Sequence, residues 1–290
     1  MPWQEIARAI ADASGQSFHP GAPRGIGGGC INQAYRLADA RSAWFVKSNS
    51  VAALAMFEAE AAGLRALSDT GLRTPRPLCT GTTGQESFIV LEYLELGRPR
   101  ADGWRLAGER LAALHGHGAD AFGWERDNTI GATPQENAWD SDWIRFWRER
   151  RLGFQLAEAS RNGHRGRVIE LGERLLEAFP ALLDHQPRPA LLHGDLWSGN
   201  LAFDASGEPV VYDPACYFGD ADADLAMTEL FGGFDHAFHE AYRSCRPAEP
   251  GYAVRRDLYN LYHVLNHLNL FGGGYLQQSI RLLERLLAEC

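Results

Sequence analysis

Residues 191–213 read LLHGDLWSGNLAFDASGEPVVYD, and they decide how the rest of the chain is interpreted. Three polar side chains, Asp195, Asn200 and Asp213, interrupt an otherwise apolar passage. The two leading leucines read as the end of a buried strand, the segment through Asn200 reads as a loop, and residues 208–212 read as a second strand. Asp213 is expected at the end of that second strand, because the proline after it cannot donate a ladder hydrogen bond.

These polar residues suit phosphoryl transfer from a magnesium nucleotide. That reaction uses one carboxylate to orient the attacking hydroxyl and accept its proton, and it uses oxygen ligands for Mg²⁺. Asp195 and Asn200 have the D-x-x-x-x-N spacing of a kinase catalytic loop, and Asp213 stands where a second metal-binding Asp would. We therefore predict Asp195 as the catalytic residue, and Asn200 and Asp213 as Mg²⁺ ligands. His193 strengthens the motif, although Asp and Asn also cap turns, which is the alternative interpretation.

Length and composition indicate an ordinary globular protein. A chain of 290 residues is at the size where one core tends to split, so we expect two lobes. Its hydrophobic content of 45% and charged content of 22% are typical of such proteins. The sequence has no apolar run long enough to span a membrane and no apolar signal core at its start, so we expect a cytoplasmic protein with no membrane partner.

Charge and cysteine content exclude several classes of site. The net charge of −9 argues against nucleic acid as a partner. The five cysteines are scattered and include no C-x-x-C pair, so neither a disulfide framework nor a zinc site is predicted.

A glycine cluster near the N-terminus is a candidate phosphate-binding loop. Gly27, Gly28 and Gly29 would let the backbone approach a nucleotide closely before the strand expected at residues 33–37. A plain hairpin turn explains such a cluster equally well. The sequence lacks G-x-x-x-x-G-K-[ST], which disfavours a Walker-type site.

Lys47 ends a short strand at residues 43–47, as the ATP-binding lysine of a kinase does. An amphipathic helix is expected over residues 51–68, and one of its glutamates should pair with Lys47. We favour Glu60 over Glu58, because Glu60 lies on the side of the helix that carries its apolar residues. A glutamate on a solvated helix face is the alternative for each.

The apolar run at residues 87–94 should end the first lobe. A kinase hinge reads adenine through main-chain groups, and we place those contacts at Glu92, Tyr93 and Leu94. The expected division is therefore a nucleotide-binding lobe at residues 1–93 and a catalytic and substrate-binding lobe at residues 94–290.

The second lobe should be mainly helical. Trp139, Trp143 and Trp147 share an i, i+4, i+8 stripe, which indicates a helix packed into the core. A polar loop is expected at residues 127–135. Asp224 reads as a structural cap that braces the catalytic loop, whereas the direction of Asp220 stays open.

The chain resembles the fructosamine kinase (ketosamine 3-kinase) family, within the protein-kinase-like superfamily that includes aminoglycoside phosphotransferases. The resemblance covers nearly the whole sequence, and HGDLWSGN with DPACYFGD is its most specific part. The segments that carry it are residues 28–31, 128–135, 193–200, 212–220, 224–234 and 266–269.

This resemblance implies an α+β, two-lobed protein-kinase-like fold, with a small antiparallel sheet and one key helix in the first lobe and a larger, mainly α-helical second lobe. It implies ATP- and Mg²⁺-dependent phosphorylation of the 3-hydroxyl of a ketosamine, either small or protein-linked, in the repair of glycated amines. Trp197 and His267 are candidate substrate residues, although Trp197 could be a core anchor and His267 a structural group. Alternatives are a kinase for another amino sugar or amino alcohol, and a pseudokinase that only binds nucleotide.

Cys30 ends the glycine cluster and is a candidate redox-active thiol. It could link two chains through a disulfide, so a monomer and a redox-linked homodimer are both open. The alternative is an unreactive small residue.

Overall fold

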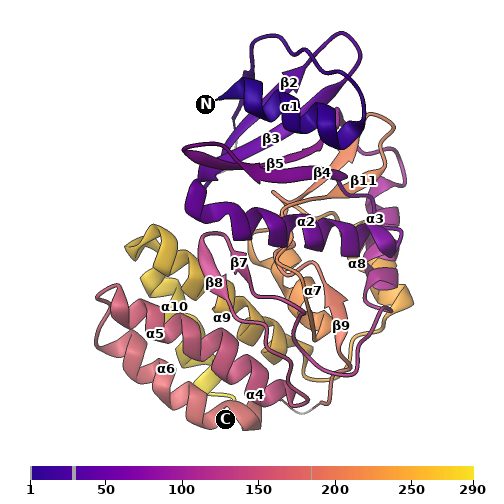
Figure 1. Ribbon diagram of the computed structural model, residues 1–290. Coiled ribbons are helices and arrows are strands. Elements are labelled where there is room, and N and C mark those ends of the chain that lie inside the picture. Colours follow the sequence, from indigo (N-terminus) through magenta and orange to yellow (C-terminus); the bar gives the residue numbers. More distant parts are fainter. Residues whose placement is uncertain (1, 28–30, 184) are drawn as a thin grey trace. The chain divides into compact units, whose positions relative to one another are not determined.

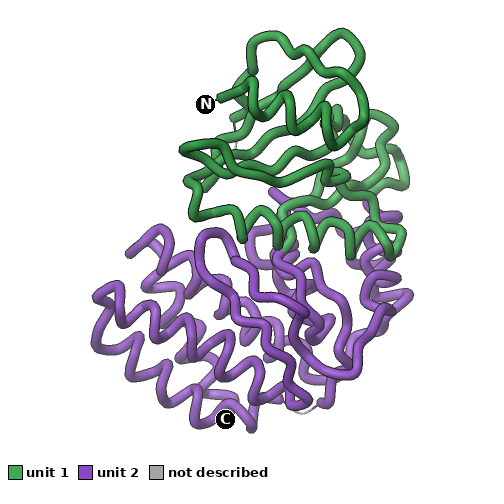
Figure 2. The backbone as a smooth tube through the Cα atoms, in the orientation of Figure 1, with its two compact units in different colours: residues 1–103, 201–214 green, residues 104–200, 215–290 purple. Residues whose placement is uncertain are grey.

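The computed structural model describes residues 2–27, 31–183 and 185–290. The chain forms two compact units (Figure 2). The first contains residues 1–103 and 201–214, and the second contains residues 104–200 and 215–290. The expected boundary at residue 93 differs from this division in two ways, because the first unit runs ten residues further and also takes up a later segment, 201–214.

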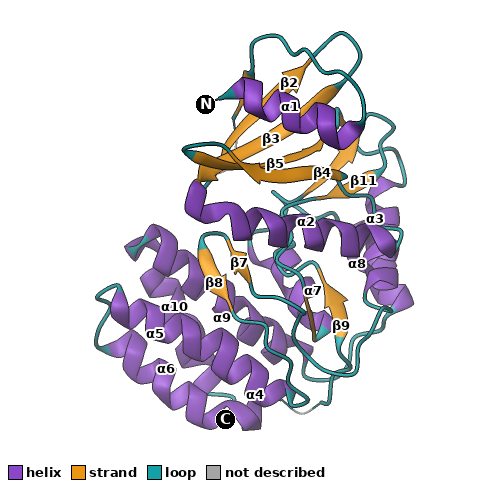
Figure 3. Cartoon of the chain, in the orientation of Figure 1, coloured by secondary structure: helices purple, strands orange, loops and turns teal. Residues whose placement is uncertain are grey.

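An antiparallel sheet of five strands forms the centre of the first unit (Figures 1 and 3). In pairing order the strands are β1 (Arg24–Ile26), β2 (Gln33–Ala38), β3 (Ala43–Ser50), β5 (Glu86–Glu92) and β4 (Pro77–Thr82). Helix α1 (Trp3–Ser14) covers one face and helix α2 (Leu54–Asp69), preceded by a 3₁₀ turn at Val51–Ala53, covers the other. The expected helix after Lys47 is thus present.

Strand β5 contributes apolar side chains to the hydrophobic cores on both faces of the sheet. Phe88 and Val90 join the core beneath α1, whereas Ile89 and Leu91 join the core beneath α2. Successive side chains of a strand point to opposite faces, so a continuous apolar run is what a sheet covered on both sides requires. Lys47 lies directly opposite Ile89 in the ladder, which places it on the α2 face.

A second, three-stranded sheet explains why residues 201–214 join the first unit. Strand β10 (Leu201–Asp204) pairs with β11 (Pro209–Val211) on one side and with β6 (Leu96–Gly97) on the other. Strand β11 is also held by a bond from the Val211 amide to the Arg73 carbonyl, of 3.0 Å. Asp213 therefore follows a strand, as expected, but that strand belongs to the first unit, which was not expected, and neither was β10.

The second unit is mainly helical (Figure 3). Its helices are α3 (Gly103–Leu114), α4 (Trp143–Trp147) continued by a π-helical segment (Arg148–Gly153) into α5 (Phe154–Arg161), α6 (Arg167–Ala178) with a 3₁₀ turn (Phe179–Leu182), α7 (Ala221–Leu230), α8 (His236–Cys245), α9 (Tyr252–Phe271), and α10 (Leu276–Leu287) after a 3₁₀ turn (Gly273–Tyr275). Helix α9 is buried along most of its length and packs against α5, α7 and α10. Among the described residues no helix is both long and apolar enough to cross a bilayer.

Two expectations for the second unit need correction. The polar loop at residues 127–135 is a hairpin of β7 (Asn128–Ile130) and β8 (Thr133–Gln135). The tryptophan stripe holds only for Trp143 and Trp147, which are buried on the helix begun by the Asp142 cap. Trp139 precedes that cap, is exposed, and stacks on Phe218.

Helix α9 also buries a histidine that makes the stability of the protein depend on pH. Burial, with a smaller effect from His267, lowers the pKa of His263 to about 3. Its Nδ1 has no hydrogen-bond partner among the described residues. Below pH ~6.5 the unfolded chain binds a proton that the folded chain does not, so stability should fall by about 1.4 kcal/mol per pH unit.

We expect His263→Leu to remove this contribution. Urea unfolding at pH 7 and pH 5 should show the wild type losing about 2 kcal/mol more than the variant between the two conditions. Equal losses in the two proteins would show that His263 is not kept neutral by its surroundings.

Candidate active site

Lys47 is the centre of an ion-pair cluster in the first unit. Its Nζ lies 2.7 Å from Oε1 of Glu60 on α2 and also pairs with the Asp213 carboxylate. The expected choice of Glu60 over Glu58 is therefore confirmed. Strand β3 brings Lys47 to this face and α2 presents Glu60 to it, so secondary structure alone positions the pair.

The cluster keeps Lys47 charged although it is buried. Burial opposes protonation, but the carboxylates of Asp213 and Glu60 outweigh it and raise the pKa of Lys47 above its usual value. Burial and the neighbouring Asp213 charge raise the pKa of Glu60. A fixed ammonium flanked by carboxylates is suited to gripping phosphate oxygens.

Asp213 has a backbone conformation that is uncommon for its residue type. Its φ of 57° lies in the left-handed region, where it is the only residue other than glycine among the described residues. Such backbone strain is concentrated at functional sites. Its side chain is 45% exposed, so the carboxylate that pairs with Lys47 is also open to a ligand.

The predicted catalytic loop, residues 193–200, lies in the second unit and follows β9 (Ala190–Leu192). The Asn200 side chain closes it, since Nδ2 donates to the Asp195 carbonyl at 2.9 Å and to Asp195 Oδ2 at 3.2 Å. The alternative interpretation of a turn-closing Asn is thus partly correct. The Asn200 Oδ1 forms no hydrogen bond with described residues. An amide oxygen here and the carboxylate of Asp213 are the ligand types that Mg²⁺ prefers.

Asp224 anchors the start of this loop, as expected, but it lies within α7 and the residue that caps the helix is Asp220. Its carboxylate accepts the His193 amide at 2.7 Å and the Gly194 amide at 2.8 Å, and the side chain is 1% exposed. Burial opposes ionisation, but hydrogen bonds from His115 and the loop hold the pKa of Asp224 below its usual value. The sequence did not identify His115, which in turn contacts the Tyr242 hydroxyl at 2.8 Å.

Gly194 is required at this anchor. Its φ is 82°, and a Cβ built there would lie 2.1 Å from the carbonyl oxygen of Ala215. The Ala215 amide in turn donates to the His193 carbonyl at 2.8 Å. The HGD motif therefore needs glycine between His193 and Asp195.

The β7–β8 hairpin holds the segment after Asp213 and was missed as part of the site. Gln135 donates to the Ala215 carbonyl at 3.1 Å, and Asn128 donates to the Cys216 carbonyl at 2.8 Å. Cys216 precedes strand β12 (Tyr217–Gly219), which pairs with β9. The polar composition of residues 127–135, and the family resemblance of residues 128–135, were the signals in the sequence for this role.

Aromatic rings continue from the catalytic loop across the second unit. Trp197 contacts Phe231 edge to face at 6.2 Å, and Phe231 contacts His267 at 4.9 Å between ring centroids. Trp197 is 39% exposed and Phe231 is 38% exposed. We call Trp197, Phe231 and His267 the aromatic surface. The Phe231 ring contacts both predicted substrate residues, and we did not predict it from the sequence.

His267 presents a neutral ring. Burial lowers its pKa, and its Nδ1 lies 2.8 Å from the His263 carbonyl. Since a carbonyl only accepts, Nδ1 carries the proton and Nε2 is the acceptor.

The remaining predicted nucleotide contacts are only partly described. The Glu92 amide donates to the Arg76 carbonyl and its carboxylate pairs with Arg73, so this residue is already engaged. Tyr93 and Leu94 follow β5 without regular structure. Gly27 follows β1, whereas Gly28, Gly29 and Cys30 lie outside the described residues.

Asp220 proves to be structural. It caps α7, is buried, and contacts His185 at 2.8 Å and the Tyr259 hydroxyl at 2.5 Å. Ligand atoms of His185, Asp220 and Asp222 lie within 4.8 Å of one another, but Arg255 already pairs with Asp222 at 2.9 Å. This cluster therefore needs no cation to balance its charge.

Comparison with known proteins identifies relatives along the whole chain. The fructosamine kinase family model matches residues 2–289. A probable ketoamine kinase of Synechocystis is 52% identical over 99% of this chain and 97% of its own length. The chloroplastic protein-ribulosamine 3-kinase of Arabidopsis thaliana is 44% identical over 90% of this chain and 81% of its own.

Solved structures of related proteins have the same fold as this chain. A Haemophilus somnus homologue of fructosamine-3-kinase superposes with a TM-score of 0.91 at 29% identity, over 98% of this chain and 97% of its own. An aminoglycoside phosphotransferase shares the fold alone, with a TM-score of 0.63 at 14% identity over 98% and 97%. The expected α+β protein-kinase-like fold is therefore confirmed, and the chain belongs to the fructosamine kinase family.

Proposed function

We propose that this chain transfers the γ-phosphoryl group of ATP to the 3-hydroxyl of a ketosamine, the adduct of fructose or ribulose with an amine or a protein lysine. The observation that carries the proposal is the cluster of Lys47, Glu60 and Asp213, because a buried, permanently charged lysine beside an exposed carboxylate is the phosphate-binding half of a kinase. The relatives named for ketoamines and ribulosamines support the acceptor.

Each residue has a role in this proposal. Lys47 binds phosphate oxygens of ATP, and the main chain of Tyr93 and Leu94 binds adenine. Asp195 orients the sugar hydroxyl and accepts its proton. Asn200 and Asp213 would hold Mg²⁺, which when bound neutralises charge on the phosphates. Asp224 positions the loop that carries Asp195, and it does so from the protein interior.

The aromatic surface is proposed to bind the acceptor. Aromatic faces contact the apolar C–H groups of sugars and attract a substrate ammonium. The Nε2 of neutral His267 can accept a hydrogen bond from a sugar hydroxyl. This surface begins within the catalytic loop at Trp197, two residues after Asp195.

We expect Trp197→Ala to raise KM for the ketosamine about tenfold and to leave KM for ATP unchanged, since it removes one aromatic contact. Steady-state kinetics with each substrate varied in turn would show the split. Trp139→Ala, which removes another exposed tryptophan outside this surface, is the matched control. Equal effects of the two substitutions would remove Trp197 from the substrate site.

The proposal is tested by Mg²⁺-dependent ATP consumption with a panel of fructose- and ribulose-amines. Phosphorylation of ketosamines in preference to aminoglycosides and choline is the expected result. Turnover only of another amino sugar or amino alcohol would favour that alternative. Nucleotide binding without any turnover would favour a pseudokinase, against which the intact Lys47, Asp195, Asn200 and Asp213 argue.

A further inference from the structure

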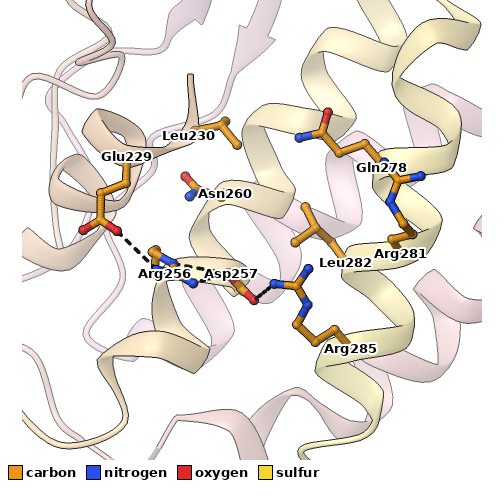
Figure 4. A pocket seen from close by; sticks show the side chains of 9 residues that line it. All are labelled: Glu229, Leu230, Arg256, Asp257, Asn260, Gln278, Arg281, Leu282 and Arg285. Atoms are coloured by element: carbon orange, nitrogen blue, oxygen red, sulfur yellow. Dashed lines mark hydrogen bonds and ion pairs between the residues drawn. The ribbon is translucent and has the colours of Figure 1, made fainter. Parts of the chain in front are cut away.

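A cavity of about 340 Å³ lies in the second unit among helices α7, α9 and α10 (Figure 4). Its volume is in the range of small-molecule sites. None of the residues assigned above to nucleotide, metal or ketosamine lines it. The lining side chains are Glu229, Leu230, Arg256, Asp257, Asn260, Gln278, Arg281, Leu282 and Arg285.

The charges of this cavity are unequal. Three arginines and two acidic residues line the cavity, and Figure 4 shows the ion pairs between them. Arg256 pairs with Glu229 at 3.3 Å and with Asp257 at 3.1 Å, and Arg285 pairs with the other oxygen of Asp257 at 2.7 Å. Both carboxylates are thus already neutralised by arginine.

Arg281 is the third arginine of the cavity and has no carboxylate partner among the described residues. Its guanidinium forms no ion pair or hydrogen bond with the described residues, and it lies one turn before Arg285 on α10. Residues four apart on a helix share a face, and both of these arginines line the cavity. Within the described part of the chain, Arg285 is paired through its Nη1 alone, which leaves further donors on its guanidinium.

Amide and apolar groups complete the lining. Asn260 is 5% exposed, and its Oδ1 has no hydrogen-bond partner among the described residues. The Gln278 side chain lies three residues before Arg281 and is likewise unpaired within the described part of the chain. Leu230 and Leu282 add apolar side chains to the lining.

We propose that this cavity binds a phosphorylated sugar. Guanidinium groups pair with phosphate through two parallel hydrogen bonds, and Arg281 and Arg285 have donors to spare. Amides that both donate and accept suit sugar hydroxyls, and the leucines suit the C–H groups between them. The site is separate from the proposed kinase chemistry and does not depend on it.

Calorimetric titration with ribose 5-phosphate tests the proposal. The protein is first saturated with Mg²⁺ and a non-hydrolysable ATP analogue, which occupies the nucleotide site. We expect ribose 5-phosphate to bind more tightly than ribose or inorganic phosphate. Arg281→Gln should weaken binding about tenfold, and Arg281→Gln with Arg285→Gln should weaken it further.

Arg281→Gln breaks no hydrogen bond or ion pair with a described residue, so we expect the variant to keep the thermal midpoint of the wild type without ligand. The matched control is Arg161→Gln with Arg165→Gln, which removes the same charge at exposed arginines outside the cavity. The thermal midpoint should rise with ribose 5-phosphate in the wild type and the control. Equal affinity for ribose, or binding unchanged by the cavity substitutions, would overturn the proposal.

Discussion

Asp195→Asn should lower kcat by about 10³-fold, because a positioned general base contributes on the order of 10²–10⁴ to such reactions. Asn has nearly the shape of Asp, and the Asp195 carbonyl would still accept the 2.9 Å bond from Asn200. The amide cannot accept the proton of the attacking hydroxyl. The loop should therefore keep its structure but lack the general base.

The measurement pairs kcat for ketosamine-dependent ADP formation with the Kd of Mg·ATP. We expect the Kd to stay within about twofold, because Lys47 and its carboxylate partners are untouched. Asp12→Asn, an exposed substitution on α1, controls for the loss of one charge. Near-normal kcat in Asp195→Asn would mean that another group accepts the proton.

Local sequence patterns predict those parts of the site that secondary structure alone positions. The strand that carries Lys47 and the helical spacing of α2 were both readable from the sequence, and together they place Lys47 against Glu60. The same holds for Asn200 and Asp195, which are five residues apart in one loop. In both cases, local secondary structure or a short loop is enough to bring the two side chains together.

Parts that depend on distant pairings were not predictable in the same way. Strand β10 pairs with its sequence neighbour β11 on one side and on the other with β6, about a hundred residues earlier, and no local propensity encodes that second pairing. His115 reaches Asp224 across 109 residues, and Phe231 joins Trp197 to His267 only through tertiary packing. Trp139 fits the helical spacing, yet the Asp142 cap starts the helix after it.

Asp224→Asn should reduce both stability and catalysis. Its carboxylate accepts two buried backbone amides and a bond from His115. An amide can accept at one oxygen only and presents a donor to the other partner, which leaves a buried N–H unpaired. The expected loss is about 3 kcal/mol in the free energy of unfolding. Because the amides belong to His193 and Gly194, kcat should also fall, by about 10²-fold.

Asp220→Asn is the control that separates these two effects. Asp220 is also a buried carboxylate at the start of α7, but its partners are His185 and Tyr259 rather than the catalytic loop. A similar loss of stability with a nearly unchanged kcat is expected there, with both variants assayed well below their thermal midpoints. If both substitutions lower kcat equally, Asp224 acts only through overall stability. If Asp224→Asn alone lowers kcat while KM for ATP holds, the carboxylate positions Asp195 from within the core.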